Sequence, residues 1–157
     1  MTVAVRAAVE DDLDVVVDLR LEFLRAVRGP DIELSAEFAV QTRSFFQREA
    51  RAGRVSTWLA FDGPDTIGVA SLLLWARPPL PEDPRSFEAY VINMYVVPTA
   101  RGRGVGRELL AMCTDGARRA GARTLLLHPT DDGLPLYRSA GFVEKTRWME
   151  LPLPLQE

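Results

Sequence analysis

The chain has 157 residues, enough for one domain with a sizeable core, and its 47% hydrophobic and 26% charged residues are typical of a globular protein rather than a disordered one. A net charge of −3 without a basic stripe argues against a general nucleic-acid binder, and no apolar run approaches the ~20 residues that cross a bilayer. Cys113 is the single cysteine and His128 the single histidine, so we expect neither a disulfide framework nor a metal site.

The N-terminal third predicts one strand followed by two helices. Residues 2–8 form a short strand candidate, and Glu10-Asp11-Asp12 place acidic side chains in the first turn of a helix that Gly29-Pro30 ends. A second helix begins at Ser35 and runs to about Gly53, with fewer apolar positions. The first residues also lack the basic and then apolar layout of a signal peptide, so we expect a cytoplasmic protein.

The middle third changes to an apolar period of two, which is typical of strands. Residues 55–62 and 67–75 flank the turn Asp62-Gly63-Pro64-Asp65 and therefore predict a hairpin. Residues 77–84 contain four prolines, which lack backbone donors, and predict a loop. A third strand is expected over residues 87–97.

The last part of the chain alternates between helix and strand patterns. It predicts a helix over 105–120, a strand over 123–127, a short helix over 134–139 and one or two closing strands within 142–153. The hairpin implies antiparallel pairing, and the later strand–helix–strand segment implies one parallel crossover. The expected fold is a single α/β (α+β) domain over residues 1–157, with a mixed, mostly antiparallel central sheet of about six to seven strands and helices on both faces.

The segment from Tyr95 to Arg107 runs from a strand end, through a glycine-rich loop, directly into a helix. Glycine permits positive φ and a close approach of a ligand to the backbone. Exposed amides at a helix N-terminus bind anions. The loop glycines are Gly102, Gly104 and Gly106, and the added positive charges are Arg101, Arg103 and Arg107. This pattern predicts a cradle for a pyrophosphate.

Two common nucleotide cradles do not fit the segment. A P-loop needs Gly-Lys-Ser/Thr, and Lys145 is the only lysine of the chain. The dinucleotide fingerprint needs a third glycine, and the two registers place Arg107 or Leu109 there. An ATP-dependent or nicotinamide-dependent enzyme is therefore disfavoured.

A third cradle matches. Residues 101–106, Arg-Gly-Arg-Gly-Val-Gly, follow the pattern Arg/Gln-x-x-Gly-x-Gly/Ala; Val96-Val97-Pro98 precedes them, and Leu-Tyr-Arg-Ser-Ala-Gly-Phe follows at residues 136–142. In these residues the chain resembles the GNAT superfamily of N-acetyltransferases, most specifically between Asn93 and Phe142. The alternative interpretation is an ordinary glycine-rich strand-to-helix turn.

The resemblance implies acetyl-CoA as co-substrate and no metal. The strand end at residues 95–97 would pair its backbone with the pantetheine arm, and the strand over 123–127 would splay away from it. The implied cofactor contacts are Tyr95, Val96, Val97, Arg101, Gly102, Arg103, Gly104, Val105, Gly106, Arg107 and Thr130. Thr130 stands where the family often has Asn, so its hydrogen bond would have a shorter reach.

The resemblance also implies direct attack of a neutral primary amine on the thioester, through a tetrahedral intermediate that a backbone amide near Val96 or Val97 stabilises. Tyr137 would be the general acid for the leaving thiolate, with a core aromatic as the alternative role. The base is open. Glu88 is one candidate, although it is equally well a solvated strand-edge charge, and His128 is a weaker one. Asn93 would orient the acceptor or a water, and a bulge would change the face that it shares with Glu88.

The acceptor expected from this interpretation is a small-molecule or peptide amine, with no nucleic acid or membrane as partner. Its binding wall would come from the two N-terminal helices and the proline-rich loop 77–86, whose acids could attract a cation: Asp31, Glu33, Glu82 and Asp83. A homodimer through the C-terminal strands stays open. The functional alternatives are a non-catalytic module that senses acyl-CoA and a transferase for a longer acyl group.

Overall fold

The computed structural model describes residues 3–145 and 149–153, and its described part is built around one sheet of five strands. The strands lie in the order β1-β2-β3-β4-β5, with the first four antiparallel and β5 parallel to β4. Their bounds are β1 (Val3–Ala7), β2 (Val55–Asp62), β3 (Asp65–Ala76), β4 (Phe87–Val96) and β5 (Ala122–Leu126). The predicted mixed, mostly antiparallel sheet is confirmed.

The strand count of six to seven is wrong for the described residues. The sequence predicts closing strands within 142–153, but residues 142–145 and 149–153 are irregular, and residues 146–148 lie outside the described part. Met149, Leu151 and Leu153 alternate as strand residues would, yet each is at least 80% exposed. Without an apolar face to bury, and with Pro152 lacking a donor, this segment has little to gain from joining the sheet.

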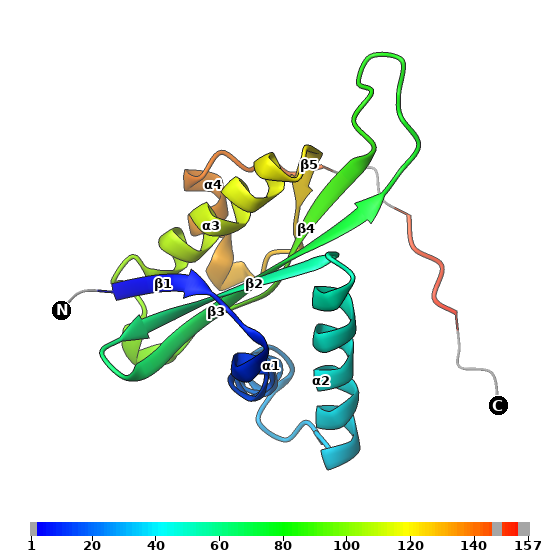
Figure 1. The fold of residues 1–157 in the computed structure, drawn as a ribbon. Coiled ribbons are helices and arrows are strands. Elements are labelled where there is room, and N and C mark those ends of the chain that lie inside the picture. Colours follow the sequence, from blue (N-terminus) through cyan, green and yellow to red (C-terminus); the bar gives the residue numbers. More distant parts are fainter. Residues whose placement is uncertain (1–2, 146–148, 154–157) are drawn as a thin grey trace.

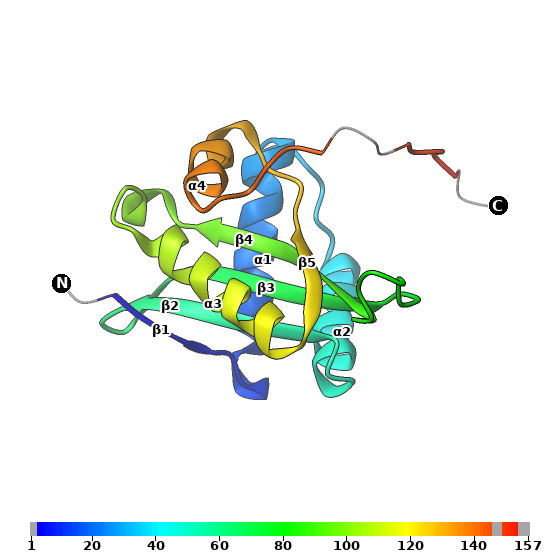
Figure 2. The ribbon, with the colours of Figure 1, turned by 90° about the horizontal axis from the view of Figure 1, so that it is seen from above.

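Helices cover both faces of the sheet (Figure 1). The helices α1 (Leu13–Arg28) and α2 (Ala36–Arg51) lie on one face, and α3 (Val105–Arg119) lies on the other. The short α4 (Leu134–Ser139) stands beside the C-terminal end of β4 (Figure 2). None of the helices in residues 3–145 has both the length and the apolar character that spanning a bilayer requires.

Local signals explain where these helices begin and end. The Ser35 hydroxyl accepts a hydrogen bond from the Phe38 amide and caps α2. Gly29, with φ of 106°, ends α1 in a conformation that side chains disfavour. Helix α3 packs closely against the sheet at Gly68, where an added Cβ would lie 3.0 Å from Leu109 and 3.1 Å from the Tyr95 carbonyl oxygen.

Two cores hold the layers together. The core under α3 includes Trp58, Leu72, Val91, Leu109 and Cys113, and the core under α1 and α2 includes Val16, Phe46, Leu59, Val69 and Tyr95. Each large side chain buried this way contributes about 1.5–3 kcal/mol. Burial also raises the pKa of the Cys113 thiol to about 12, so this residue stays protonated and serves as packing rather than as a nucleophile.

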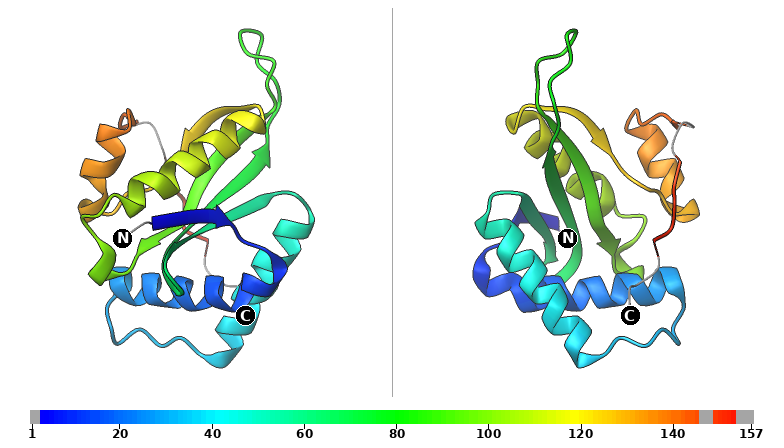
Figure 3. Two further views of the ribbon diagram at one scale, coloured as in Figure 1. Left: turned by 60° about the vertical axis from the view of Figure 1, so that its left-hand side comes forward. Right: turned by 90° about the vertical axis from the view of Figure 1, so that its right-hand side faces the viewer.

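Strands β4 and β5 separate halfway along β4. Their pairing ends with Tyr90 opposite Leu126, whereas β4 continues to Val96 (Figure 3). In the stretch that β5 leaves, β4 is still paired with β3. From Ile92 to Tyr95, β4 advances by three residues while β3 advances by only two. The extra residue is a β-bulge at Asn93, whose φ of 54° is left-handed. The fold therefore opens one side of β4 over its C-terminal half.

Candidate active site

The glycine-rich turn joins β4 to α3. Gly102 and Gly104 have φ of 74° and 83°, which favour glycine at both positions. Gly104 occupies the residue before α3, and it has no side chain to cap the helix. The first amides of α3, at Val105, Gly106 and Arg107, are therefore left without intrahelical acceptors. Together with the helix dipole, they form a site for an anion.

The three arginines of the turn take different directions. The Nε of Arg101 donates to the Val96 carbonyl oxygen at 3.0 Å. The guanidinium of Arg103 pairs with Asp62 at 2.9 Å, on the turn between β2 and β3. Arg101 and Arg107 line the cavity beside the turn, whereas Arg103 does not.

The glycine-rich turn borders a cavity of about 790 Å³, which we call the turn cavity. Its wall comes from the turn, the end of β4, one face of α1 and the segment 130–137. A second cavity of about 560 Å³, which we call the helix cavity, lies between α1, α2 and the open half of β4. The two cavities share four lining residues, which mark where they meet: Phe23, Met94, Thr130 and Tyr137.

Tyr137 is buried at this junction. An added Cβ on Gly133 would lie 2.9 Å from the Tyr137 ring, so the small residue there allows the ring to lie against the chain. The Phe142 ring packs edge-on at 5.8 Å between centroids. Burial, with a smaller contribution from Cys113, raises the pKa of the Tyr137 phenol, which keeps it protonated at neutral pH.

Asn93 lines the helix cavity from the bulge of β4. The residue is only 3% exposed, and neither Nδ2 nor Oδ1 has a hydrogen-bond partner among the described residues. Leaving both ends of a buried amide unpaired costs roughly 1–3 kcal/mol for each group. Both groups of the Asn93 amide are therefore available to a ligand or an ordered water in the helix cavity.

Glu88 lies in the opposite, paired half of β4 and lines neither cavity. Its carboxylate accepts from Trp75 at 3.2 Å, from Arg77 at 2.8 Å and from Arg123 at 3.3 Å. Burial by itself raises the pKa of Glu88, but these donors outweigh it, so the net shift is downward. The structure brings Tyr137, Asn93 and Thr130 together and leaves Glu88 apart from them.

His128 lines the helix cavity just after β5. Its Nδ1 is hydrogen-bonded to the Tyr90 hydroxyl, and Trp75 stacks on Tyr90 with centroids 5.7 Å apart. This aromatic support fixes the imidazole ring and leaves Nε2 without a partner among the described residues.

The backbone at the end of β4 is divided between the sheet and the turn cavity. The Val97 amide donates to the Ile67 carbonyl oxygen at 3.0 Å and is therefore occupied. Since antiparallel pairing alternates along a strand, the Val96 amide points away from β3, toward the side that β5 has left. Of the two amides suggested by the sequence, that of Val96 is the one not directed at β3, and Val96 lines the turn cavity.

Sequence reasoning predicted part of the helix-cavity wall. The two N-terminal helices contribute to it as expected, but the proline-rich loop 77–86 does not, and none of the four acids expected there lines it. Among the described residues, the charged side chain that lines the helix cavity is Arg20. The sequence does contain a signal that places Arg20 on the buried face of its helix, because Arg20 lies at helical spacing between the apolar Val16 and Phe23.

Comparisons with known proteins agree with this geometry. Residues 20–142 match the acetyltransferase (GNAT) family. A predicted acetyltransferase from Clostridium acetobutylicum, solved with acetyl-CoA, superposes with a TM-score of 0.86 at 23% identity and 96% coverage of each chain. A GCN5-related N-acetyltransferase from Ralstonia eutropha JMP134 has a TM-score of 0.82 at 25% identity, over 97% of this chain and 99% of that one.

A shorter sequence match points the same way. An IAA acetyltransferase of Azospirillum brasilense is 43% identical over 58 residues, which are 35% of this chain. The matched segment spans only 38% of that protein.

Proposed function

Because the chain belongs to the acetyltransferase (GNAT) family, we propose that it transfers an acetyl group from acetyl-CoA to a primary amine. The observation that carries the proposal is the meeting of two cavities at Tyr137, one beside an uncapped helix N-terminus and one between the helices. Two co-substrates can then approach the same point, one from each cavity.

The residues of the turn cavity fit coenzyme A. The free amides of Val105, Gly106 and Arg107 suit its pyrophosphate, and the Arg107 guanidinium adds charge at the same place. The Val96 amide suits an amide carbonyl of the pantetheine arm or the developing negative charge on the thioester oxygen. When bound, acetyl-CoA supplies an activated carbonyl carbon, and the residues of this chain position it and move the protons.

We assign the general acid to Tyr137. Its raised pKa keeps the phenol protonated at neutral pH, and its place at the junction suits proton donation to the departing thiolate sulfur.

We assign the general base to His128 in place of Glu88. No carboxylate lines the helix cavity among the described residues, and an imidazole ring nitrogen that carries no hydrogen can accept a proton. In the tautomer with the proton on Nδ1, that nitrogen donates to the Tyr90 oxygen, and Nε2 accepts from the amine directly or through water. The Asn93 amide oxygen would accept from the amine N–H and orient its lone pair.

The test is an acetyl-transfer assay with purified protein, acetyl-CoA and a panel of amines. Thiol release together with a 42-Da mass gain on the amine, about the mass of an added acetyl group, would support transfer. Acetyl-CoA binding without transfer to any amine would support a sensing module instead. Longer acyl-CoAs in parallel measure the acyl preference.

A further inference from the structure

The helix cavity is walled by aromatic and aliphatic side chains. Helices α1 and α2 contribute four phenylalanines, and the sheet side adds Leu73, Val91, Ile92 and Met94; the phenylalanines are Phe23, Phe38, Phe45 and Phe46. No Asp or Glu of the described residues lines it. A site for a polyamine or another multiply charged cation would need acids here, so the lining favours an apolar acceptor body.

Of the residues that the structure describes, Arg20 is the one charged residue in this wall. It is half-buried, and it makes no ion pair or hydrogen bond with any residue in the described part of the chain. Its guanidinium lies over the Phe23 ring, 5.3 Å from the centroid. Burial, and then the positive charge of Arg28, lowers the pKa of Arg20. The environment of this cation is therefore apolar and positive, which suits an anion from outside the chain.

The position of Arg20 relates it to the reaction point. Phe23 lines both cavities, and Arg20 lies three residues before it on the same face of α1. At 1.5 Å per residue, the two positions are about 4.5 Å apart along the helix axis. An anion held by Arg20 thus lies on the acceptor side, within a small molecule's length of the junction at Tyr137.

We infer that the acceptor is an amine that also carries a carboxylate and an apolar or aromatic side chain, which is the class of apolar amino acids, and that Arg20 pairs with the carboxylate. This inference rests on the proposed function. The amine nitrogen bonds to the acetyl carbon as the carbon–sulfur bond breaks; the amine proton passes to His128, and the thiolate takes a proton from Tyr137. Peptide or protein amines, which lack a carboxylate next to the amine, are disfavoured.

The experiment compares L-phenylalanine with phenethylamine, which differ only by the carboxylate. Leucine, methionine and tryptophan are tested with their decarboxylated amines in the same way. We expect kcat/KM to be about 10- to 100-fold higher for the amino acid of the preferred pair, as one charge-assisted contact provides. In Arg20→Gln that preference is lost, because kcat/KM falls more for the amino acid than for the decarboxylated amine. Arg20→Lys keeps part of it, because the charge remains without the planar fork.

Arg28→Gln is the matched control. It removes the same charge from the same helix, but Arg28 lines neither cavity, so the preference for the amino acid should persist. Thermal unfolding of each variant separates a loss of folding from a loss of recognition.

The outcomes separate the two proposals. Equal or better acetylation of the decarboxylated amines, or equal loss of both substrates in Arg20→Gln, overturns the inference and leaves the acetyltransferase intact. Failure to bind acetyl-CoA overturns both. If acetyl-CoA binds but no amine of the panel reacts, calorimetry with CoA and N-acetylphenylalanine decides: binding weakened by Arg20→Gln supports the inference, and absent or unchanged binding overturns it.

Discussion

The two halves of β4 differ in what surrounds them. Over residues 87–90 the strand is paired on both sides, and its buried Glu88 has three hydrogen-bond donors. Over residues 91–96 it is paired on one side only, and its equally buried Asn93 has no partner in the described residues. Burial of a polar group is common to both halves. What distinguishes them is whether the protein itself satisfies that group, and the unsatisfied half borders the cavities.

From this contrast we expect the paired half to be mainly a structural element and the open half to be a binding element. Substitution of Glu88 in the paired half should lower the free energy of unfolding and leave turnover unchanged. Substitutions around the open half should lower turnover and leave the free energy of unfolding unchanged.

The largest effect is expected for Tyr137→Phe at the open half. Removing the phenol hydroxyl removes the proposed proton donor, and kcat should fall about 1,000-fold, equivalent to about 4 kcal/mol. The dissociation constant of acetyl-CoA, measured by calorimetry, should change less than about threefold because the ring remains. A kcat within a factor of five of the unsubstituted protein would remove Tyr137 from the chemistry.

Glu88→Gln in the paired half should produce the opposite pattern. The substitution leaves Arg123, whose side chain is 10% exposed, without its carboxylate, and we expect a loss of about 3 kcal/mol in urea unfolding at pH 7. The folded pKa of Glu88 is lowered, so its contribution is full above the unfolded pKa of about 4.3 and is lost as the pH falls through the folded value. The stability difference between the two proteins should therefore shrink in acid. A large fall in kcat with unchanged stability would restore Glu88 as the base.

His128→Asn tests the proposed base. We expect kcat/KM to fall about 30-fold, or about 2 kcal/mol. Tyr90→Phe should cost less, because it loosens the ring without removing it. An unchanged kcat/KM in His128→Asn would exclude the imidazole as the base.

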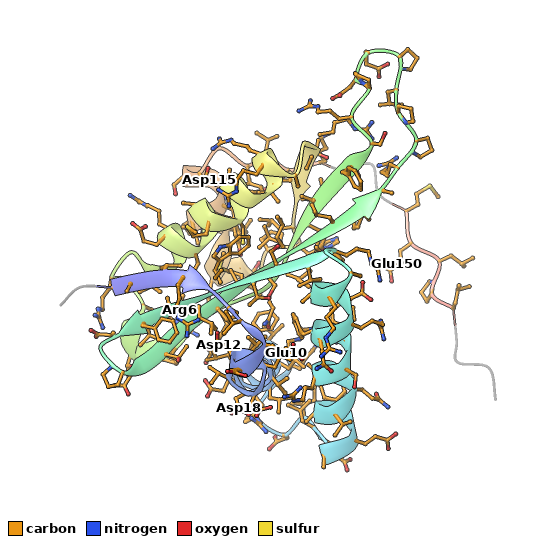
Figure 4. All side chains as sticks on the ribbon, viewed as in Figure 1. Arg6, Glu10, Asp12, Asp18, Asp115 and Glu150 are labelled. Carbon is orange, nitrogen blue, oxygen red and sulfur yellow. The ribbon has the colours of Figure 1, made fainter. Side chains whose placement is uncertain are left out.

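Asp12→Asn lies outside β4 and should have the smallest effect. Asp12 pairs with Arg6 of β1 at 2.6 Å (Figure 4), and this hydrogen bond lowers the pKa of Asp12 to about 2. The Arg6 side chain is half exposed, so we expect only about 1 kcal/mol at pH 7, after allowing for solvent screening. This contribution is full above pH ~4 and disappears as the pH falls toward about 2. Urea unfolding between pH 2 and 7 measures it, and a pH-independent difference would contradict the pairing.

Local sequence signals predicted most of the fold. Ser35, Gly29 and the prolines near 80 act on their immediate neighbours, so helix bounds and the loop could be located from the chain alone. The closing strands could not, because alternation in Met149 to Leu153 describes a local pattern, whereas a strand also needs a partner and a surface to cover. The family resemblance rested on the glycine-rich turn, and it is confirmed.

The site was only partly predictable, since its parts come from distant segments. The turn and Tyr137 lie within one stretch of sequence, and the structure places them along one cavity. The position of Glu88 depends on arginines 11 residues before and 35 after it, which no local pattern reveals. His128 and Arg20 likewise acquire their surroundings only when β5 separates from β4 and α1 crosses the sheet.

The central claim is that the open half of β4 and the turn beside it hold acetyl-CoA, and calorimetric titration tests it most directly. A Cβ added to Gly106 would lie 3.2 Å from Leu136 and 3.9 Å from Val96, so Gly106→Val crowds the wall of the turn cavity. Ala111→Val makes a similar change on the exposed face of α3. We predict saturable binding of acetyl-CoA but not of NADH or ATP, unchanged in Ala111→Val and at least about 30-fold weaker in Gly106→Val. No binding to the unsubstituted protein, or equal binding to Gly106→Val, would contradict the account.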